Sequence, residues 1–337
     1  FDNTFDAQRL AEQASSSSAP LELITLRPAD HDKVGPVLDA LPGVVVTPQA
    51  DLLPTDDRFA PAIIAQVKKA VIDQLDGEAG WRVVSVNQNG ADVDILNEVA
   101  PQPAPSMSIT LDRPVQNAAQ HAVDTQGRKA MMVVIKPSTG DILAIAQNAA
   151  ADADGPAATT GLYPPGSTFK IVTAGAAIDR AMATPNTLLG CPGQIDIGDR
   201  TIPNYDKFDL GTVPMAKAFA NSCNTTFAEL ASRMPPTALT VAASQYGIGP
   251  DYVVDGITTV TGSVPPTVNL AERTEDGFGQ GKVLVTPFGM ALAAATVAAG
   301  KTPTPHLISG TRTTETGDHP PISPPMLDGL REMMRLV

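Results

Sequence analysis

The sequence has 337 residues, of which 43% are hydrophobic and 18% charged, and its formal net charge at pH 7 is −13. A chain of this length exceeds what one hydrophobic core usually serves, so we predict a globular protein with two domains. The acidic balance, without any dense block of lysine and arginine, excludes nucleic-acid binding or anionic-membrane binding through a basic patch.

The chain starts without a methionine, and it contains no signal peptide and no apolar run of membrane-spanning length. We therefore expect a leader or an N-terminal anchor upstream of the given sequence. Residues 1–20 predict a short helix followed by a flexible serine-rich stretch.

Short apolar runs and one helical pattern follow up to residue 105. Their composition predicts strands at residues 21–26, 43–46 and 81–86, and a helix at residues 60–75. The proline-rich stretch at residues 101–105 marks a domain boundary, which divides the chain into residues 1–105 and 106–337.

The second part alternates between strand and helix signals. We expect a strand at 108–112, a helix at 113–123, strands at 131–135 and 142–146 joined by a hairpin turn, a helical cluster from 167 to about 234, and helices at 288–299 and 326–337. Thr286 and Pro287 are a typical cap and first-turn pair for the helix at 288–299, and Gly300 is expected to end it. Strands on both sides of a helical insert predict a sheet with helices on both faces.

The stretch Tyr-Pro-Pro-Gly-Ser-Thr-Phe-Lys, at residues 163–170, leads directly into an apolar helical run. Ser167 is predicted at the cap or in the first turn, where Ser167 and Lys170 share one face. Lysine can take a proton from a serine hydroxyl only if desolvation or positive neighbours lower the lysine pKa. This spacing taken alone also fits a capping serine beside a solvated lysine.

A second polar group occurs in the sequence Asn-Ser-Cys-Asn-Thr-Thr-Phe at residues 221–227. In a loop between helices, Ser222 could pass protons, while Asn224 could contact Lys170 and hydrogen-bond a peptide-like substrate. Ser85 and Asn87 show the same spacing, but they lie in a strand-like run and are interpreted as sheet surface.

These two motifs, together with Gly-Gln-Gly-Lys at 279–282 and Thr-Pro at 286–287, resemble the penicillin-binding proteins, and most closely the class B transpeptidases of the actinobacterial type. The resemblance covers residues 21–337 and is strongest from residue 107. It implies an α/β transpeptidase domain of the penicillin-binding and serine β-lactamase type, with a sheet flanked by helices. A smaller mixed α/β N-terminal domain, a pedestal, would precede it.

The resemblance also implies roles and a reaction. Ser167 would be the nucleophile and Lys170 its general base, with Ser222 and Asn224 as the second motif. The enzyme would be acylated by peptidoglycan stem peptides ending in D-Ala-D-Ala, would transfer the acyl group to an amine, and would be inhibited by β-lactams. No cofactor is implied. The setting would be the extracytoplasmic membrane face, through an upstream anchor and beside the cell-wall synthesis machinery.

Two other function classes stay open. A D,D-carboxypeptidase or serine β-lactamase would need a group that activates water, and residues 193–209 contain no glutamate for that role. A β-lactam-binding sensor or scaffold would be acylated without turnover. The family's third motif, K-[ST]-G, is absent from the sequence, and we expect it after the last helix, beyond residue 337 or in an omitted segment. Lys301-Thr302-Pro303 is a poor substitute because proline lacks the N–H that a substrate-pairing strand needs.

The cysteines and histidines complete the candidate groups. Cys191 and Cys223 fit either one disulfide, which would tie a loop to the wall of the cleft, or two reduced buried thiols. The four histidines show no spacing typical of a metal site or of a serine-histidine-aspartate triad: His31, His121, His306 and His319.

Overall fold

The computed structural model describes residues 26, 28–38, 40, 41, 43–46, 54–56, 58–71, 80–86, 92–100, 102, 104 and 106–337. Contacts divide the chain into two units, residues 1–51 and 52–337, and each unit is described by itself. The domain division that the sequence predicts at residue 105 stays a prediction.

The first unit contains one helix, α2 (Pro28–Leu38), among its described residues. The strand predicted at 43–46 is wrong, because residue 43 lies in a turn and residues 44–46 pair with no strand in the described part of the chain. The helix predicted within residues 1–20 and almost all of the strand at 21–26 lie outside the described residues.

The second unit begins with a helix and a hairpin. Helix α3 (Pro61–Val71) confirms most of the predicted helix, and residues 72–75 lie outside the described part. Strand β1 (Trp81–Val86) pairs antiparallel with β2 (Asp92–Val99), which confirms the predicted strand at 81–86. Ser85 lies in β1, as expected for sheet surface, and Asn87 is not among the described residues.

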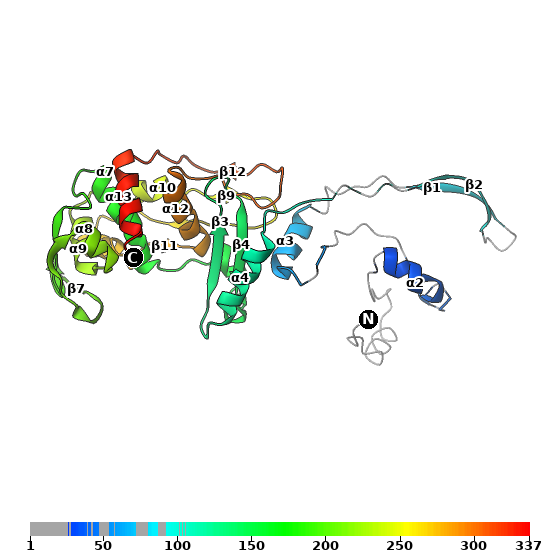
Figure 1. Ribbon diagram of the computed structural model, residues 1–337, viewed down its shortest axis with the longest axis horizontal. Helices are drawn as coiled ribbons and strands as arrows, with labels where there is room; N and C mark the ends of the chain where they lie inside the picture. Colours follow the sequence, from blue (N-terminus) through cyan, green and yellow to red (C-terminus); the bar gives the residue numbers. More distant parts are fainter. Residues whose placement is uncertain are drawn as a thin grey trace. The chain divides into compact units, whose positions relative to one another are not determined.

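A second hairpin has helices on both faces (Figure 1). Strand β3 (Met131–Ile135) pairs antiparallel with β4 (Ile142–Gln147), as predicted. Helix α4 (Arg113–Asp124) packs on one face, and α12 (Pro287–Ala299) packs on the other. Two separate clusters show this, one with Ala119, Val123, Ala144 and Ala146, the other with Ile135, Ile145, Phe288 and Leu292.

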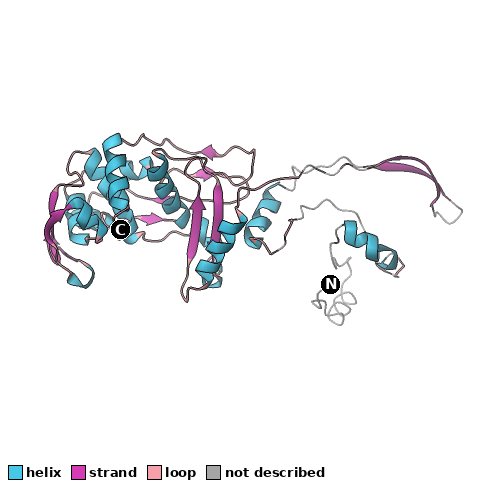
Figure 2. Cartoon of the chain, in the orientation of Figure 1, coloured by secondary structure: helices cyan, strands magenta, loops and turns pink. Residues whose placement is uncertain are grey.

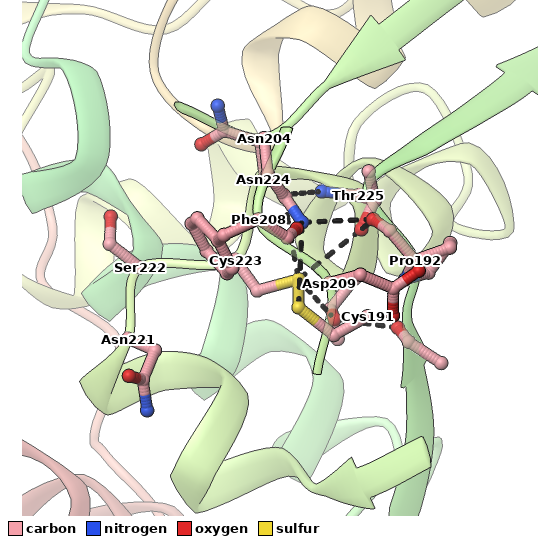
Figure 3. The surroundings of a disulfide bond; sticks show 12 residues. Cys191, Pro192, Asn204, Phe208, Asp209, Asn221, Ser222, Cys223, Asn224 and Thr225 are labelled. Carbon is pink, nitrogen blue, oxygen red and sulfur yellow. Dashed lines mark hydrogen bonds between the residues drawn. A yellow bond between two sulfur atoms is a disulfide. The ribbon is translucent and has the colours of Figure 1, made fainter. Parts of the chain in front are cut away.

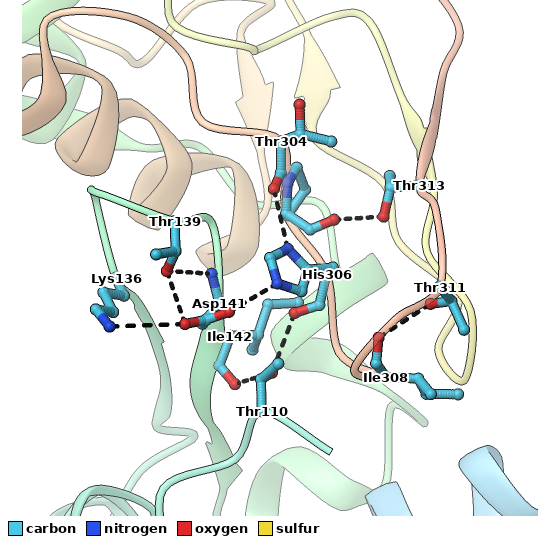
Figure 4. Close-up of polar contacts among 11 residues, drawn as sticks. Thr110, Lys136, Thr139, Asp141, Ile142, Thr304, His306, Ile308, Thr311 and Thr313 are labelled. Carbon is cyan, nitrogen blue, oxygen red and sulfur yellow. Dashed lines mark hydrogen bonds and ion pairs between the residues drawn. The ribbon is translucent and has the colours of Figure 1, made fainter. Parts of the chain in front are cut away.

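The hairpin turn is held by a segment from much later in the chain (Figure 4). Thr110 Oγ1 donates to Ile142 O and His306 O, at 2.8 and 3.1 Å. His306 Nε2 lies 2.7 Å from Asp141 Oδ1. The strand predicted at 108–112 is largely wrong, because only one bridge forms there, between Ile109 and Ile308. The chain leaves the extended path early because the Asp112 side chain caps α4.

Two short helices, α5 (Ala149–Asp152) and α6 (Ala157–Thr160), follow the hairpin, and most of the later helices form a lobe beside it (Figure 2). It contains α7 (Lys170–Asp179), α8 (Met215–Ala220), α9 (Asn224–Ser232), α10 (Ala238–Gln245), α11 (Leu270–Asp276) and α13 (Pro324–Met334), and the side chains of most of them share one core. The predicted helices at 288–299 and 326–337 correspond to α12 and α13. Thr286 caps α12 and Gly300 ends it, as predicted.

The predicted helical cluster at 167–234 is wrong in its middle. Two antiparallel pairs interrupt it, namely β5 (Leu188–Cys191) with β8 (Gly211–Pro214) and β6 (Gln194–Ile197) with β7 (Arg200–Pro203). Glycines permit this at two points, the turn at Gly198 and the first residue of β8, Gly211, since both residues adopt positive φ. Short strands complete the fold: β9 (Tyr252–Val253) pairs with β12 (Thr314–Glu315), and β10 (Gly262–Ser263) with β11 (Leu284–Val285).

No helix in the described part of the chain combines the length and the apolar character that a membrane crossing requires.

Candidate active site

Ser167 lies in a tight 3-10 turn, η2 (Gly166–Phe169), immediately before α7. The N-cap residue of this turn is Pro165, so Ser167 belongs to the first turn and not to the cap. Residues three apart eclipse each other in a 3-10 turn, and this brings Lys170 under Ser167. Lys170 Nζ lies 2.8 Å from Ser167 Oγ. The predicted shared face is confirmed.

The two groups differ sharply in their exposure to solvent. Ser167 is exposed, whereas only 1% of the Lys170 surface is exposed. Burial penalises the charged ammonium and lowers the pKa of Lys170 to about 7. The Phe227 ring contributes to this setting, with its centre 5.9 Å from Nζ. The lysine is therefore suited to act as a neutral amine near neutral pH.

The second motif completes the surroundings of the amine. Lys170 Nζ lies 2.7 Å from Asn224 Oδ1, 2.9 Å from Ser222 O and 3.0 Å from Ser222 Oγ. A neutral amine has two N–H groups and one lone pair. It can donate to Asn224 Oδ1 and Ser222 O while its lone pair accepts the proton of Ser167.

Ser222 connects the two motifs across 55 residues of sequence. Its hydroxyl donates to Ser167 Oγ at 2.7 Å, and it lies in the loop between α8 and α9, as predicted. Its φ of 58° is left-handed, which costs a non-glycine residue on the order of 1 kcal/mol. The surrounding structure must hold this conformation in place.

A disulfide helps to stabilise the backbone conformation of Ser222 (Figure 3). Cys191, at the end of β5, is bonded to Cys223, directly after Ser222, and both cysteines are buried. Of the two states that the sequence left open, the structure has the disulfide. It ties the Cys191 loop to the second motif, across a sequence separation of 32 residues.

A buried asparagine beside the disulfide supports the same segment, and sequence reasoning missed it. Asn204 Nδ2 donates to Pro192 O and Phe208 O, both at 2.9 Å, and its Oδ1 accepts from Thr225 N at 3.1 Å. Asn204 thereby fixes the start of α9 next to Asn224. No sequence signal pointed to it, because Pro192 and Thr225 lie 12 and 21 residues away from it in the sequence.

The Gly-Gln-Gly-Lys segment contacts the turn that carries Ser167. Gly166 N donates to Gly279 O at 2.9 Å, and a Cβ on Gly279 would lie 2.2 Å from Gly166 O. The buried Asp276 shapes this segment, since its carboxylate accepts from Lys282 N at 2.6 Å and Thr267 Oγ1 at 2.7 Å. Burial raises the pKa of the Asp276 carboxyl. The segment therefore braces the turn that carries Ser167.

Residues 130–337 match the family model described as the penicillin binding protein transpeptidase domain. The chain belongs to this family. It is 27% identical over 274 residues to peptidoglycan D,D-transpeptidase MrdA of Escherichia coli K12, covering 71% of this chain and 43% of MrdA. It is 31% identical over 211 residues to peptidoglycan D,D-transpeptidase PbpA of Mycobacterium tuberculosis H37Rv, covering 53% of this chain and 43% of PbpA.

Solved structures agree with this assignment. Penicillin-binding protein A of M. tuberculosis, as a ceftriaxone acyl-enzyme complex, is 26% identical, with a TM-score of 0.60 over 69% of this chain and 62% of that one. The predicted resemblance to class B transpeptidases and the predicted fold class are therefore confirmed. The chain spans less than half the length of the curated relatives named above.

The other candidate groups of this penicillin-binding protein lie elsewhere. Lys301-Thr302-Pro303 forms a loop after α12, where Thr302 Oγ1 donates to Gln245 O. It donates to none of the four clustered residues, namely Ser167, Lys170, Ser222 and Asn224. His306 pairs with Asp141, and His319 stacks on Tyr252. The described residues contain no group of histidine, cysteine and carboxylate side chains suited to a metal ion.

The close approach at Gly279 gives a testable prediction. Gly279→Ala should destabilise this penicillin-binding protein by about 1–3 kcal/mol and slow acylation of Ser167 about tenfold or more, because the new Cβ displaces Gly166. Thermal unfolding and the rate of benzylpenicillin acylation measure the two effects. Gly155→Ala is the matched control, since Gly155 has nearly the same φ but open space around it. Equal acylation rates in the two variants would contradict the bracing role.

Proposed function

We propose that this penicillin-binding protein is a peptidoglycan D,D-transpeptidase that works through an acyl-serine intermediate on Ser167. The observation that carries the proposal is the buried Lys170 amine, 2.8 Å from the exposed Ser167 hydroxyl. The names of the curated relatives support the same reaction, since they are peptidoglycan D,D-transpeptidases.

In the first step, Ser167 Oγ attacks the carbonyl between the two D-alanines of a stem peptide, while Lys170 Nζ accepts its proton. The backbone N–H of Ser167, in the first turn of η2, can donate to the oxygen that becomes negative. Ser222 Oγ contacts both Ser167 Oγ and Lys170 Nζ, so it can pass the proton to the departing D-alanine.

In the second step, an amine of another peptide attacks the Ser167 ester. The amine loses a proton through the same Ser222 and Lys170 groups, and Ser167 regains its hydroxyl proton. Asn224 positions Lys170 through its Oδ1 and can hydrogen-bond the peptide chain of the substrate. The four clustered residues include no carboxylate to activate water, which favours transfer to an amine over hydrolysis.

The setting of the enzyme is part of the same proposal. We place it on the extracytoplasmic face of the cell membrane, held by an anchor upstream of the given residues and working with cell-wall synthesis machinery. The disulfide between Cys191 and Cys223 supports an oxidising location outside the cytoplasm. β-Lactams are proposed as covalent inhibitors, as the acyl-enzyme complexes of the M. tuberculosis relative suggest.

The direct test is the intact mass of the full-length protein during incubation with benzylpenicillin over several hours. A stable adduct that maps to Ser167 is the expected result. A transient adduct with steady consumption of the drug would replace the transpeptidase by a hydrolase. Absence of any adduct would overturn the proposed acyl-serine chemistry.

A further inference from the structure

A pocket of about 260 Å³ lies among three segments that are far apart in the sequence. They are the end of α10 at Gln245, the loop after α12 at Lys301 and Thr302, and the loop between β12 and α13 at residues 317–322 (Figure 1). None of the four clustered residues of the active site lines this pocket. A molecule bound there would therefore take no part in the chemistry at Ser167.

Gln245 joins the three segments. Its backbone O accepts a hydrogen bond from Thr302 Oγ1 at 3.1 Å, and its side-chain Nε2 donates to Pro321 O at 3.2 Å. The second bond fixes the orientation of the carboxamide, because a carbonyl oxygen accepts only from the Nε2 side. The position of the other carboxamide atom, Oε1, is therefore set by the fold.

This carboxamide oxygen has no donor. Only 7% of Gln245 is exposed, and Oε1 accepts no hydrogen bond from any residue that the structure describes. The oxygen is not among the sealed atoms that lack a partner, so it is reached from the pocket that Gln245 lines. A nearly buried acceptor costs free energy until a donor reaches it. Oε1 therefore marks a place for an N–H group of a ligand.

His319 holds one wall of the pocket in place. Its ring stacks on Tyr252 with 5.4 Å between the centroids, Nδ1 lies 3.2 Å from Ser244 O, and Nε2 lies 2.7 Å from the Tyr252 hydroxyl. Because Ser244 O can only accept, Nδ1 carries the proton and Nε2 accepts from Tyr252. Both ring nitrogens are used within the protein, so the histidine shapes the pocket and leaves ligand binding to other groups.

Two charged side chains at the pocket are unused. Lys301 and Asp318 are exposed, and in the described part of the chain neither side chain forms an ion pair or a hydrogen bond. Glu315 is already engaged, since its Oε1 accepts from Thr304 Oγ1 at 2.7 Å. The pocket thus offers one cation, one carboxylate and one neutral acceptor. These match the carboxylate and the ammonium N–H donors of a zwitterion.

We propose that this pocket binds a small zwitterion, namely a free α-amino acid. Its ammonium group donates to Gln245 Oε1 and faces Asp318, and its carboxylate faces Lys301. Since one water molecule takes about 30 Å³ in the liquid, the pocket has room for a molecule of several heavy atoms. The site goes beyond the proposed function and does not depend on it.

The test is a binding titration of the full-length protein, followed by ligand-observed NMR. D-alanine and L-alanine are the probes, as the smallest amino acids with a side chain. D-alaninamide, which lacks the carboxylate, and N-acetyl-D-alanine, which lacks the ammonium group, are compared with them. Each titration is repeated with benzylpenicillin present, so that binding in the active site is recognised by its loss.

Three variants locate the binding. Lys301→Met and Asp318→Asn change exposed side chains, so the fold should survive, and Gln245→Met removes the buried acceptor. Lys217→Met and Asp328→Asn are the matched controls, because both positions are exposed and neither lines the pocket.

At least one alanine should bind with a Kd of about 1 mM or tighter, with or without benzylpenicillin. Lys301→Met and Asp318→Asn should each weaken this binding about fivefold, and Gln245→Met about tenfold. Both controls should leave it unchanged. D-alaninamide should bind Lys301→Met as well as it binds the unmodified protein, since the carboxylate that faces the lysine is gone.

Three results would each overturn the site. One is that neither alanine binds the unmodified protein. Another is binding that disappears when benzylpenicillin is added. The third is binding that Lys301→Met and Asp318→Asn both retain at full strength.

Discussion

Ser167→Ala is expected to abolish covalent labelling by benzylpenicillin and to lower peptide transfer by at least about a thousandfold. The hydroxyl is the exposed oxygen that lies within hydrogen-bond distance of both Lys170 Nζ and Ser222 Oγ. Removing the hydroxyl leaves the Lys170 base without a nucleophile. Ser222 cannot replace Ser167, because its position is strained and partly buried. Intact mass after incubation with the drug measures the labelling.

Thr168→Ala is the control for this variant. Thr168 is exposed and adjacent, but its hydroxyl is turned away to donate to Pro165 O at 2.8 Å. It should be labelled at close to the normal rate. An adduct on the Ser167→Ala protein at another residue would show that the nucleophile has been assigned wrongly.

Lys170→Met is expected to slow acylation about a thousandfold while Ser167 stays in place, since a positioned general base contributes about 10²–10⁴. Methionine has a similar length and suits the buried site beside Phe227, so the fold should survive. Lys217→Met, at an exposed lysine of α8, is the control for loss of a positive charge. The acylation rate constant is the measurement, and near-normal acylation of Lys170→Met would disprove the role of base.

The pH dependence of acylation tests the same residue without removing it. Lys170 accepts a proton only when it is neutral, and burial lowers its pKa to about 7. The rate should therefore rise with pH up to about 7 and level off above it. Two pH units below that value, acylation should be about a hundredfold slower, since the neutral fraction falls tenfold per unit. The acylation rate of Lys170→Met should not show this pH dependence. A flat pH profile in the unmodified protein would contradict the role of Lys170 as the titrating base.

The local features of this protein could be predicted from the amino-acid sequence alone. The spacing of Ser167 and Lys170 predicted that the two side chains share one face, because three residues of a tight turn bring them to the same side. Their direct contact needed the burial of the lysine, since the same spacing also fits a solvated lysine. The cap at Thr286, the stop at Gly300 and the hairpin of β3 and β4 were equally readable. Each depends on neighbours a few residues away.

The errors of prediction have two causes. Residues 43–46 and 108–112 have strand-like composition, yet a strand forms only when it pairs with another strand. That partner can lie far away in the sequence, so composition alone does not predict the pairing. The interruption of the helical cluster by β5 to β8 was missed because strands of four residues carry little periodic signal.

The chemistry of the site depends on how the whole chain packs. The pKa of Lys170 depends on burial, and burial depends on Phe227 and on the second motif. Gly279 bracing Gly166 and Asn204 holding the start of α9 join segments far apart in sequence. Bringing distant segments together costs conformational entropy. Burial of a shared core offsets that cost, so these contacts form only when the whole chain packs.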